Sequence, residues 1–266
     1  MSDPIYAEPR TVEDASDCFF YHTMEIPGVG LVEGTFDLRE SLDDYFGAVD
    51  FEGKRVIEVG PASGYLTFSM EARGADVVVI ETSEEFTWDA VPYDLPLLET
   101  WGTELLPYMQ KLRNSFWFTH RRLNSKARVH YGSGYSLPDE LGRFDVGLMS
   151  CVLLHTRDPL AIIRNCAALV DERLVIIDIY NEELDQSGIP AMTFCPRRDN
   201  EMVHTWWHLS PAMLREYAAI LGFEEVHFSR HVQRFAPVQG GETEPQEQFT
   251  MVLERKRPWR PIPRRS

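Results

Sequence analysis

The sequence predicts an α/β fold: a doubly wound, mostly parallel sheet of seven strands that closes with an antiparallel hairpin. Three observations support this fold class. Runs of β-branched residues alternate with segments of helical spacing, a glycine-containing turn follows an early run, and two apolar runs of strand length end the core. The 266 residues, of which 44% are hydrophobic, suffice for one domain with a full core.

The first part of the chain, residues 1–50, is expected to form an extension outside the sheet. A short helix is predicted near Thr11–Phe19, and helical spacing over Asp37–Val49 places apolar residues on one face. We expect this extension to serve as a lid, in which His22 could close over a bound ligand.

The core is expected over residues 51–254. In order, we predict a strand at Arg55–Gly60, a helix at Tyr65–Arg73, strands at Asp76–Glu81, Arg128–Tyr131 and Phe144–Ser150, a helix at Pro159–Leu169, a strand at Leu174–Tyr180, a helix that Ser210 caps and that ends near Leu221, and an antiparallel pair of Glu225–Phe228 with Phe249–Glu254. Two connections are longer than an ordinary βα unit needs, so we expect insertions near 82–126, with a helix from Thr103 to about Leu123, and near 181–209.

The stretch Val56–Tyr65 predicts a ligand site, because it combines a buried strand, a tight turn and the start of a helix. Glycines at 60 and 64 let the backbone turn sharply and approach a ligand. The next strand ends in Glu81, 21 residues after Gly60, where a carboxylate can bind two ribose hydroxyls. A nicotinamide or flavin site is disfavoured, because Ala62 and Tyr65 occupy the second and third glycine positions of G-x-G-x-x-G.

This pattern resembles the first two motifs of the class I S-adenosylmethionine-dependent methyltransferases. The alternative is a glycine turn in an ordinary α/β domain. The resemblance implies a Rossmann-like methyltransferase fold and S-adenosylmethionine as cofactor, with Glu58 orienting its methionine part. The cofactor-binding residues that it implies are Glu58, Gly60, Pro61, Ala62, Ser63, Gly64, Glu81, Thr82, Ser133, Gly134, Ser150 and Cys151. Ser133 replaces the usual aspartate of the adenine-side loop, so Ser133, backbone amides of that loop or Trp88 are expected to bind adenine.

A narrower resemblance covers roughly Asp37–Arg257 and is to the bacterial wobble-uridine tRNA carboxymethyltransferases and their uncharacterised relatives. The matching pieces are Asp37-Leu38-Arg39, the glycine motif, Val152-Leu153-Leu154-His155 before Arg157-Asp158-Pro159, and Trp207-His208-Leu209-Ser210-Pro211 before the late helix. In that family a tyrosine associated with a carboxylated cofactor precedes the motif histidine, whereas this chain has Leu154. We therefore expect ordinary S-adenosylmethionine and an acceptor other than tRNA.

Charge supports the same expectation. The net charge is −16, and residues 255–266 contain six basic residues and no acidic one, which leaves 20 basic against 42 acidic residues before them. A body with a net charge of −22 repels phosphates, so nucleic acid is a disfavoured partner. We expect residues 255–266 to form a flexible basic tail.

Histidines are the candidate catalytic residues. Methyl transfer is an in-line displacement, and a hydroxyl acceptor needs a base that works near neutral pH. His155 is the first candidate, because it follows the strand that should end beside the sulfonium, and His204 and His208 lie in the second insertion. In the alternative, His155 caps a turn and His22 is structural. We expect no metal site, since no acidic partner accompanies the i, i+4 spacing of His204 and His208.

The sequence therefore predicts a methyltransferase that acts at an oxygen of a small molecule, a natural product or a sugar. The alternatives are a tRNA wobble-uridine-modifying enzyme and a non-catalytic module that retains the cofactor fold. The tryptophans of the insertions could wall an acceptor pocket, belong to the core or form a homodimer contact; they are Trp88, Trp101, Trp117, Trp206 and Trp207.

The chain is expected to be cytoplasmic and not bound to a membrane. Its N-terminus lacks the basic and apolar regions of a signal peptide, and no apolar stretch approaches the roughly 20 residues of a membrane helix. The four cysteines show no C-x-x-C pair, which indicates reduced thiols.

Overall fold

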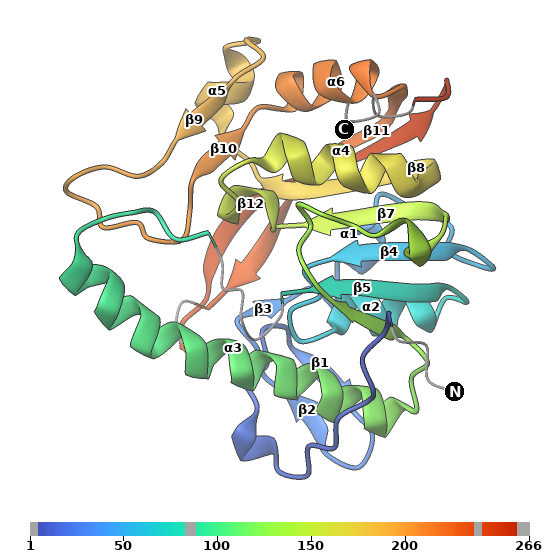
Figure 1. Ribbon diagram of the computed structural model, residues 1–266, viewed down its shortest axis with the longest axis vertical. Coiled ribbons are helices and arrows are strands. Elements are labelled where there is room, and N and C mark those ends of the chain that lie inside the picture. The colour runs from blue at the N-terminus through green and yellow to red at the C-terminus, as the bar shows by residue number, and fades with distance from the viewer. Residues whose placement is uncertain (1–4, 83–88, 237–240, 260–266) are drawn as a thin grey trace.

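A central eight-stranded sheet with helices on both faces forms the body of the protein in the computed structural model, which describes residues 5–82, 89–236 and 241–259 (Figure 1). The strand order is β3 (Phe36–Asp37), β11 (Phe223–Phe235), β12 (Glu244–Arg255), β8 (Val170–Ile179), β7 (Phe144–Ser150), β4 (Arg55–Val59), β5 (Asp76–Glu81) and β6 (Arg128–Tyr131). The five strands from β8 to β6 are parallel, whereas β12 is antiparallel to both of its neighbours and β3 is antiparallel to β11.

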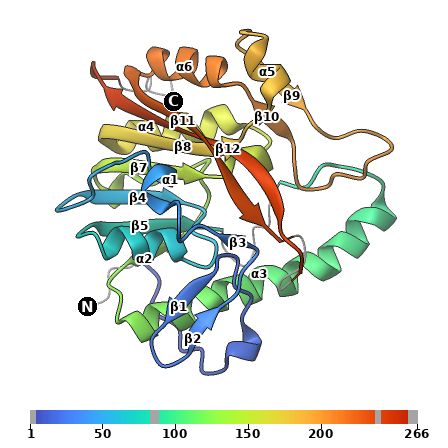
Figure 2. The same cartoon turned by 180° about the vertical axis from the view of Figure 1, so that it is seen from behind.

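The α/β class, the parallel centre of the sheet and the terminal antiparallel hairpin are confirmed, but the sheet has eight strands rather than seven. The additional strand, β3, lies where helical spacing predicted the start of a helix. Phe36 and Asp37 pair with Phe235 and Arg234, at the far end of a hairpin that is longer than predicted. Figure 2 shows the β11–β12 hairpin running obliquely to the parallel strands of the same sheet and reaching toward β3. Polar residues dominate the distal half of the hairpin, so the sequence there lacks the apolar pattern that predicts a strand.

Six α-helices are present among the described residues: α1 (Leu42–Tyr45), α2 (Tyr65–Glu71), α3 (Leu95–Leu123), α4 (Pro159–Leu169), α5 (Glu182–Gln186) and α6 (Pro211–Ile220). Short 3₁₀ turns occur at Ala15–Asp17, Asp139–Leu141 and Leu153–His155, and two small hairpins are formed by β1 (Met24–Ile26) with β2 (Gly30–Val32) and by β9 (Met192–Phe194) with β10 (Trp207–Leu209). No helix of the described chain has the length and apolar character that crossing a bilayer requires.

Helix α3 fills most of the first insertion and begins earlier than the predicted start at Thr103. It begins at Leu95, because the side chain of Asp94 accepts a hydrogen bond from the N–H of Leu97 and Pro96 lies in the first turn. At the other end, Asn124 adopts a left-handed conformation that stops the helix. The predicted end near Leu123 is confirmed.

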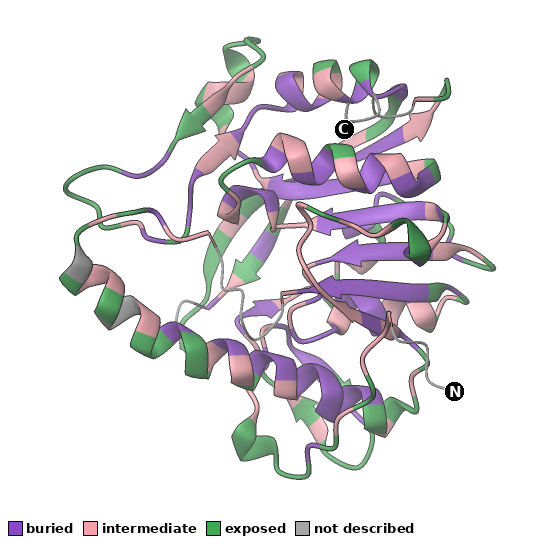
Figure 3. Ribbon diagram, viewed as in Figure 1, coloured by how far each residue is buried: buried purple, intermediate pink, exposed green. Residues whose placement is uncertain are grey.

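The two faces of the sheet bury separate cores (Figure 3). Alternation along each strand divides the side chains, so that Val56 faces α2 and the C-terminal half of α3 while Ile57 faces α4 and α6. The central strands are therefore apolar on both faces, as buried parallel strands require. Their carboxyl ends are held at one edge of the molecule.

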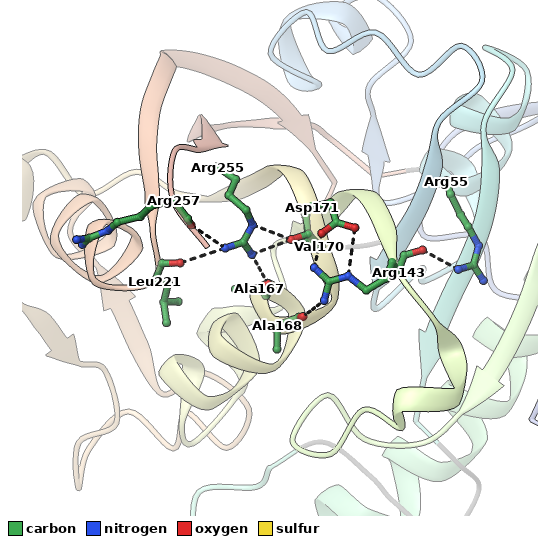
Figure 4. Close-up of polar contacts among 9 residues, drawn as sticks. All are labelled: Arg55, Arg143, Ala167, Ala168, Val170, Asp171, Leu221, Arg255 and Arg257. Carbon is green, nitrogen blue, oxygen red and sulfur yellow. Dashed lines mark hydrogen bonds and ion pairs between the residues drawn. The ribbon is translucent and has the colours of Figure 1, made fainter. Parts of the chain in front are cut away.

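Arginines tie the opposite, amino-terminal edge of the sheet together (Figure 4). Arg255 donates hydrogen bonds to the carbonyl oxygens of Val170, at 2.7 and 3.0 Å, and of Ala167, at 2.5 Å, so it caps the end of α4. The backbone N–H groups of Lys256 and Arg257 bond to the carbonyl of Gly222. The expectation of a flexible tail from residue 255 is thus wrong for Arg255–Arg257; residues 260–266 lie outside the described residues.

Replacing Arg255 with methionine is expected to lower the free energy of unfolding by about 3 kcal/mol, because carbonyls at the end of α4 lose their donors in a partly buried place. Urea denaturation measures this loss. The matched control is Arg121→Met, which removes an exposed ion pair with Glu13 and should change stability by less than about 0.5 kcal/mol. Equal losses in the two variants would contradict the capping role of Arg255.

Candidate functional site

A cavity of about 330 Å³ opens at the carboxyl ends of β4, β5 and β7. The chain passes from β4 to β5 and β6 on one side of the sheet, and then from β7 to β8 on the other. The topological switch point between β4 and β7 is where open α/β sheets bind ligands. The predicted cofactor residues that line the cavity are Gly60, Pro61, Ala62, Glu81, Thr82, Ser133, Gly134, Ser150 and Cys151.

The glycine turn after β4 forms the floor of this cavity. Gly60 has φ +75°, and an added Cβ there would lie 3.0 Å from a methyl group of Val152. Gly64 does not line the cavity; it caps α2 at φ +89°, and its Cβ would lie 2.5 Å from the Phe68 ring. Ser63 also lies outside the wall, where its hydroxyl accepts the N–H of His22 at 3.2 Å. The turn therefore lines the cavity through Gly60 and binds the N-terminal segment through Ser63.

Glu81 is a buried carboxylate in the cavity wall, at the end of β5. Its Oε1 accepts hydrogen bonds from the N–H of Thr82 at 2.7 Å and from the Thr82 hydroxyl at 2.8 Å. These bonds fix the carboxylate without using Oε2. Arg113 supports the arrangement by donating to the Thr82 hydroxyl at 3.1 Å. Burial raises the pKa of Glu81, and the bonds from Thr82 and the charge of Arg113 oppose the rise.

Glu58 lies behind the turn rather than in the cavity wall. It is buried within β4, and its Oε2 accepts a hydrogen bond of 2.5 Å from the Thr67 hydroxyl. Burial raises its pKa to about 7, and the charge of Glu81 contributes to the rise. Any effect of Glu58 on a ligand would therefore act through its charge or through the turn.

The end of β7 brings Ser150 and Cys151 to the cavity. Cys151 has φ +48°, a left-handed conformation that is unusual for a non-glycine residue, and its N–H donates to the carbonyl of Ile177 at 2.8 Å. The hydroxyl of Tyr45 lies 2.7 Å from the Ser150 hydroxyl. Tyr45 belongs to the segment Asp37–Val49, for which the sequence predicted only an apolar helix face, so its place in the cavity wall is a new finding.

Of the three predicted catalytic histidines, the structure brings only His155 to the wall of this cavity. Its Nδ1–H donates to the carbonyl oxygen of His204 at 2.6 Å, which places the lone pair on Nε2. Burial lowers the pKa of His155 to about 4. The exposed His204 ring lies 5.5 Å from that of His155, and His208 pairs with Thr193 in the β9–β10 hairpin.

His22 lines the cavity from the N-terminal segment. It is buried, and burial lowers its pKa to about 3. The segment is held by a hydrogen bond of 2.7 Å from the N–H of Thr23 to the carbonyl of Phe36. This position is compatible with the lid role predicted for residues 1–50.

Hydrogen bonds join the two insertions at the other end of the cavity. The Asp89 carboxylate accepts from the hydroxyl of Tyr135 and, at 2.8 Å, from the N–H of Arg157. The indole N–H of Trp206 donates to the Asp89 carbonyl at 2.6 Å. Trp206 does not line the cavity, but it holds Asp89, which does. The hydroxyl of Ser133 accepts the N–H of Tyr135 at 3.2 Å, while Trp88 lies outside the described residues.

A profile of the methyltransferase domain matches residues 36–235. The chain belongs to this family of methyltransferase domains. None of the curated proteins compared with this methyltransferase matches it.

Solved structures share the fold of this methyltransferase. Magnesium protoporphyrin IX methyltransferase from Synechocystis PCC 6803 superposes with a TM-score of 0.52 at 17% identity, over 82% of this chain and 81% of that one. The 1,6-didemethyltoxoflavin-N1-methyltransferase from Burkholderia thailandensis gives a TM-score of 0.50 at 14% identity, over 82% of this chain and 80% of that one. A protein from Pyrococcus horikoshii, proposed to be an RNA methyltransferase, gives 0.53 at 11% identity over 81% and 84%.

Proposed function

We propose that this methyltransferase transfers the methyl group of S-adenosylmethionine to an oxygen atom of a small molecule, a natural product or a sugar. The observation that carries the proposal is the pairing of a buried carboxylate with the glycine turn in one cavity: Glu81 ends β5 beside Gly60 at the switch point. The Synechocystis enzyme has been solved with S-adenosylhomocysteine bound, which supports this choice of cofactor.

The cavity wall suggests how the cofactor would lie. Glu81 would accept hydrogen bonds from the ribose diol, and Ser133 and Gly134 would flank the adenine. The methionine part would cross Gly60 and place the sulfonium near Ser150, at the end of β7. When bound, the cofactor supplies a methyl group on a positively charged sulfur, and the residues of this chain orient the acceptor and exclude water.

The rest of the cavity supports an uncharged acceptor. Aromatic and apolar side chains, among them Tyr21, Phe36 and Met109, form much of the cavity wall. Arg157 is the one Lys or Arg among the residues that line the described cavity. A site built in this way suits a ring or a sugar face better than a phosphate.

His155 is the proposed base for a hydroxyl acceptor. Burial lowers its pKa to about 4 and so keeps the imidazole neutral at physiological pH, and its Nε2 lone pair would accept the proton as the new carbon–oxygen bond forms. His204 would then hold the imidazole through its backbone carbonyl, at 2.6 Å from Nδ1, rather than act itself. His208 lies in the β9–β10 hairpin away from the cavity wall, and we propose no chemical step for it.

Radiolabelled S-adenosylmethionine tests the acceptor class. The protein is incubated with a panel of phenols, glycosides and polyketides and, separately, with total tRNA at two salt concentrations. We expect label in a small molecule and none in tRNA, because the body of the chain carries a charge of −22. Label in tRNA would instead favour the wobble-uridine alternative. If titration calorimetry detects no heat of binding for either S-adenosylmethionine or S-adenosylhomocysteine, a non-catalytic module would be favoured.

The affinity for S-adenosylmethionine is expected to rise by up to about tenfold between pH 6 and pH 8. Burial raises the pKa of Glu58 to about 7, so the carboxylate that attracts the sulfonium forms within this range. Titration calorimetry of the wild type and of Glu58→Gln measures the effect, which should disappear in the variant. A slope that persists in Glu58→Gln would contradict this assignment.

A further inference from the structure

A chain of mostly part-buried hydrogen bonds runs behind the acceptor end of the cavity. The Ser41 hydroxyl donates to Gln233 Oε1 at 2.9 Å, and Gln233 Nε2 donates to His231 Nδ1 at 2.8 Å. His231 Nε2 lies 2.9 Å from the Thr250 hydroxyl, which donates to the backbone carbonyl of Tyr45 at 2.8 Å. Of these five residues, only Tyr45 lines the cavity.

The direction of the donors fixes the protonation state of the chain. The Gln233 amide donates to Nδ1 of His231, so the proton of a neutral imidazole is on Nε2 and is donated to Thr250. Thr250 in turn gives its own proton to the carbonyl of Tyr45. Burial lowers the pKa of His231 to about 4, which keeps the ring neutral at physiological pH. Each donor in the chain therefore has an acceptor.

Tyr45 is held at three points by this arrangement. Its carbonyl accepts from Thr250, its ring lies against His231 with centroids 5.2 Å apart, and its hydroxyl lies 2.7 Å from the Ser150 hydroxyl. Ser150 and Thr250 are both in register with Ile177 of β8, so the sheet sets their separation. The Tyr45 side chain is 2% exposed and thus has little freedom to leave this place.

The Tyr45 hydroxyl lies beside Ser150, where the sulfonium of the cofactor is expected. Ser150 ends β7 across the switch point from Gly60, where the sulfonium would lie. Burial raises the pKa of the Tyr45 hydroxyl well above its usual range, so this group stays protonated and can donate or accept a hydrogen bond. Gln248 lines the same end, and its buried Oε1 has no partner among the described residues.

We propose that Tyr45 is a catalytic residue that, with Ser150, holds the acceptor oxygen in line with the methyl group, and that His231 is the positioning residue that supports Tyr45. This inference rests on the proposed function. In the step it serves, a bond forms between the acceptor oxygen and the methyl carbon, the carbon–sulfur bond breaks, and its electron pair stays on sulfur. The acceptor proton passes to the proposed base, His155.

Sinefungin, in which a carbon bearing an amino group replaces the sulfonium and its methyl group, tests this inference without the natural acceptor. S-adenosylhomocysteine lacks any group at that place, so the ratio of the two affinities reports on the surroundings of the methyl position. We expect Tyr45→Phe to weaken sinefungin binding about tenfold and S-adenosylhomocysteine binding by less than about twofold. Calorimetry on the full chain measures both ligands.

Two further variants complete the test. Tyr217→Phe also removes a tyrosine hydroxyl bond, at 3.0 Å to the carbonyl of Leu160 in the distant α4–α6 contact, and should leave the ratio unchanged. His231→Phe keeps an aromatic ring against Tyr45 but interrupts the chain of hydrogen bonds. It should lower the ratio of the sinefungin affinity to the S-adenosylhomocysteine affinity about threefold. An unchanged ratio in Tyr45→Phe would overturn the inference. A wild-type protein that binds neither ligand would contradict the proposed function instead.

Discussion

Replacing Glu81 with glutamine is expected to weaken the binding of S-adenosylmethionine by about 100-fold, the loss of roughly two hydrogen bonds from a ribose diol to a charged acceptor. The glutamine side chain has nearly the same shape but carries an amide N–H₂ where the carboxylate would accept a hydroxyl proton. Because Glu81 is buried and fixed by Thr82 and Arg113, water cannot replace the lost interaction.

Titration calorimetry of wild type and Glu81→Gln measures this loss. Asp76→Asn is the matched control, since Asp76 begins the same strand at the opposite, exposed end and pairs there with Arg128. This control should bind the cofactor within about twofold of the wild type, because exposed ion pairs contribute little. Tight binding by Glu81→Gln would place the ribose elsewhere.

Replacing Gly34 with alanine is expected to lower the free energy of unfolding by about 3 kcal/mol. An added Cβ would lie 2.3 Å from the carbonyl carbon of His22 and 2.6 Å from the backbone nitrogen of Thr23. These are backbone atoms, and they cannot move aside without breaking the bonds that tie the N-terminal segment to Phe36. Cofactor affinity should fall as well, because His22 belongs to the cavity wall.

Thermal denaturation and limited proteolysis of the N-terminal segment measure this effect. Gly102→Ala is the control, because an added Cβ there meets nothing within 4 Å and alanine favours the helix that contains it. This control should be as stable as the wild type or slightly more so. A Gly34→Ala protein of unchanged stability would show that the segment is not held as described.

The centre of the fold was predictable because its strands are buried on both faces. The predicted bounds of β5, β6, β7 and α4 agree with the structure. Continuous β-branched runs such as Val77–Ile80 and a capping pair such as Asp158-Pro159 have few alternative interpretations.

The edges of the fold were not predictable in the same way. Strand β3 is two residues long and exists only because β11 lies beside it. The helix predicted over Asp37–Val49 shrinks to α1, Leu42–Tyr45, since Phe36 and Asp37 join the sheet instead. Tertiary pairing outweighed local spacing at these positions.

The cofactor side of the site followed from sequence, whereas the acceptor side did not. Gly60 follows β4 and Glu81 ends the adjacent parallel strand β5, so topology alone brings them together. Tyr45, Gln248 and Asp89 come from α1, β12 and the first insertion, and only the folded structure shows that they share one cavity. An aromatic residue on an apolar helix face gives no sign in sequence that its hydroxyl reaches Ser150.

A crystal structure with S-adenosylhomocysteine is the most direct test of the central claim, that the cavity between the glycine turn and Glu81 is a cofactor site. We predict density for the ribose hydroxyls within hydrogen-bonding distance of the Glu81 carboxylate and for the sulfur between Gly60 and Ser150. Ligand density anywhere else, or an empty cavity at saturating S-adenosylhomocysteine, would contradict it.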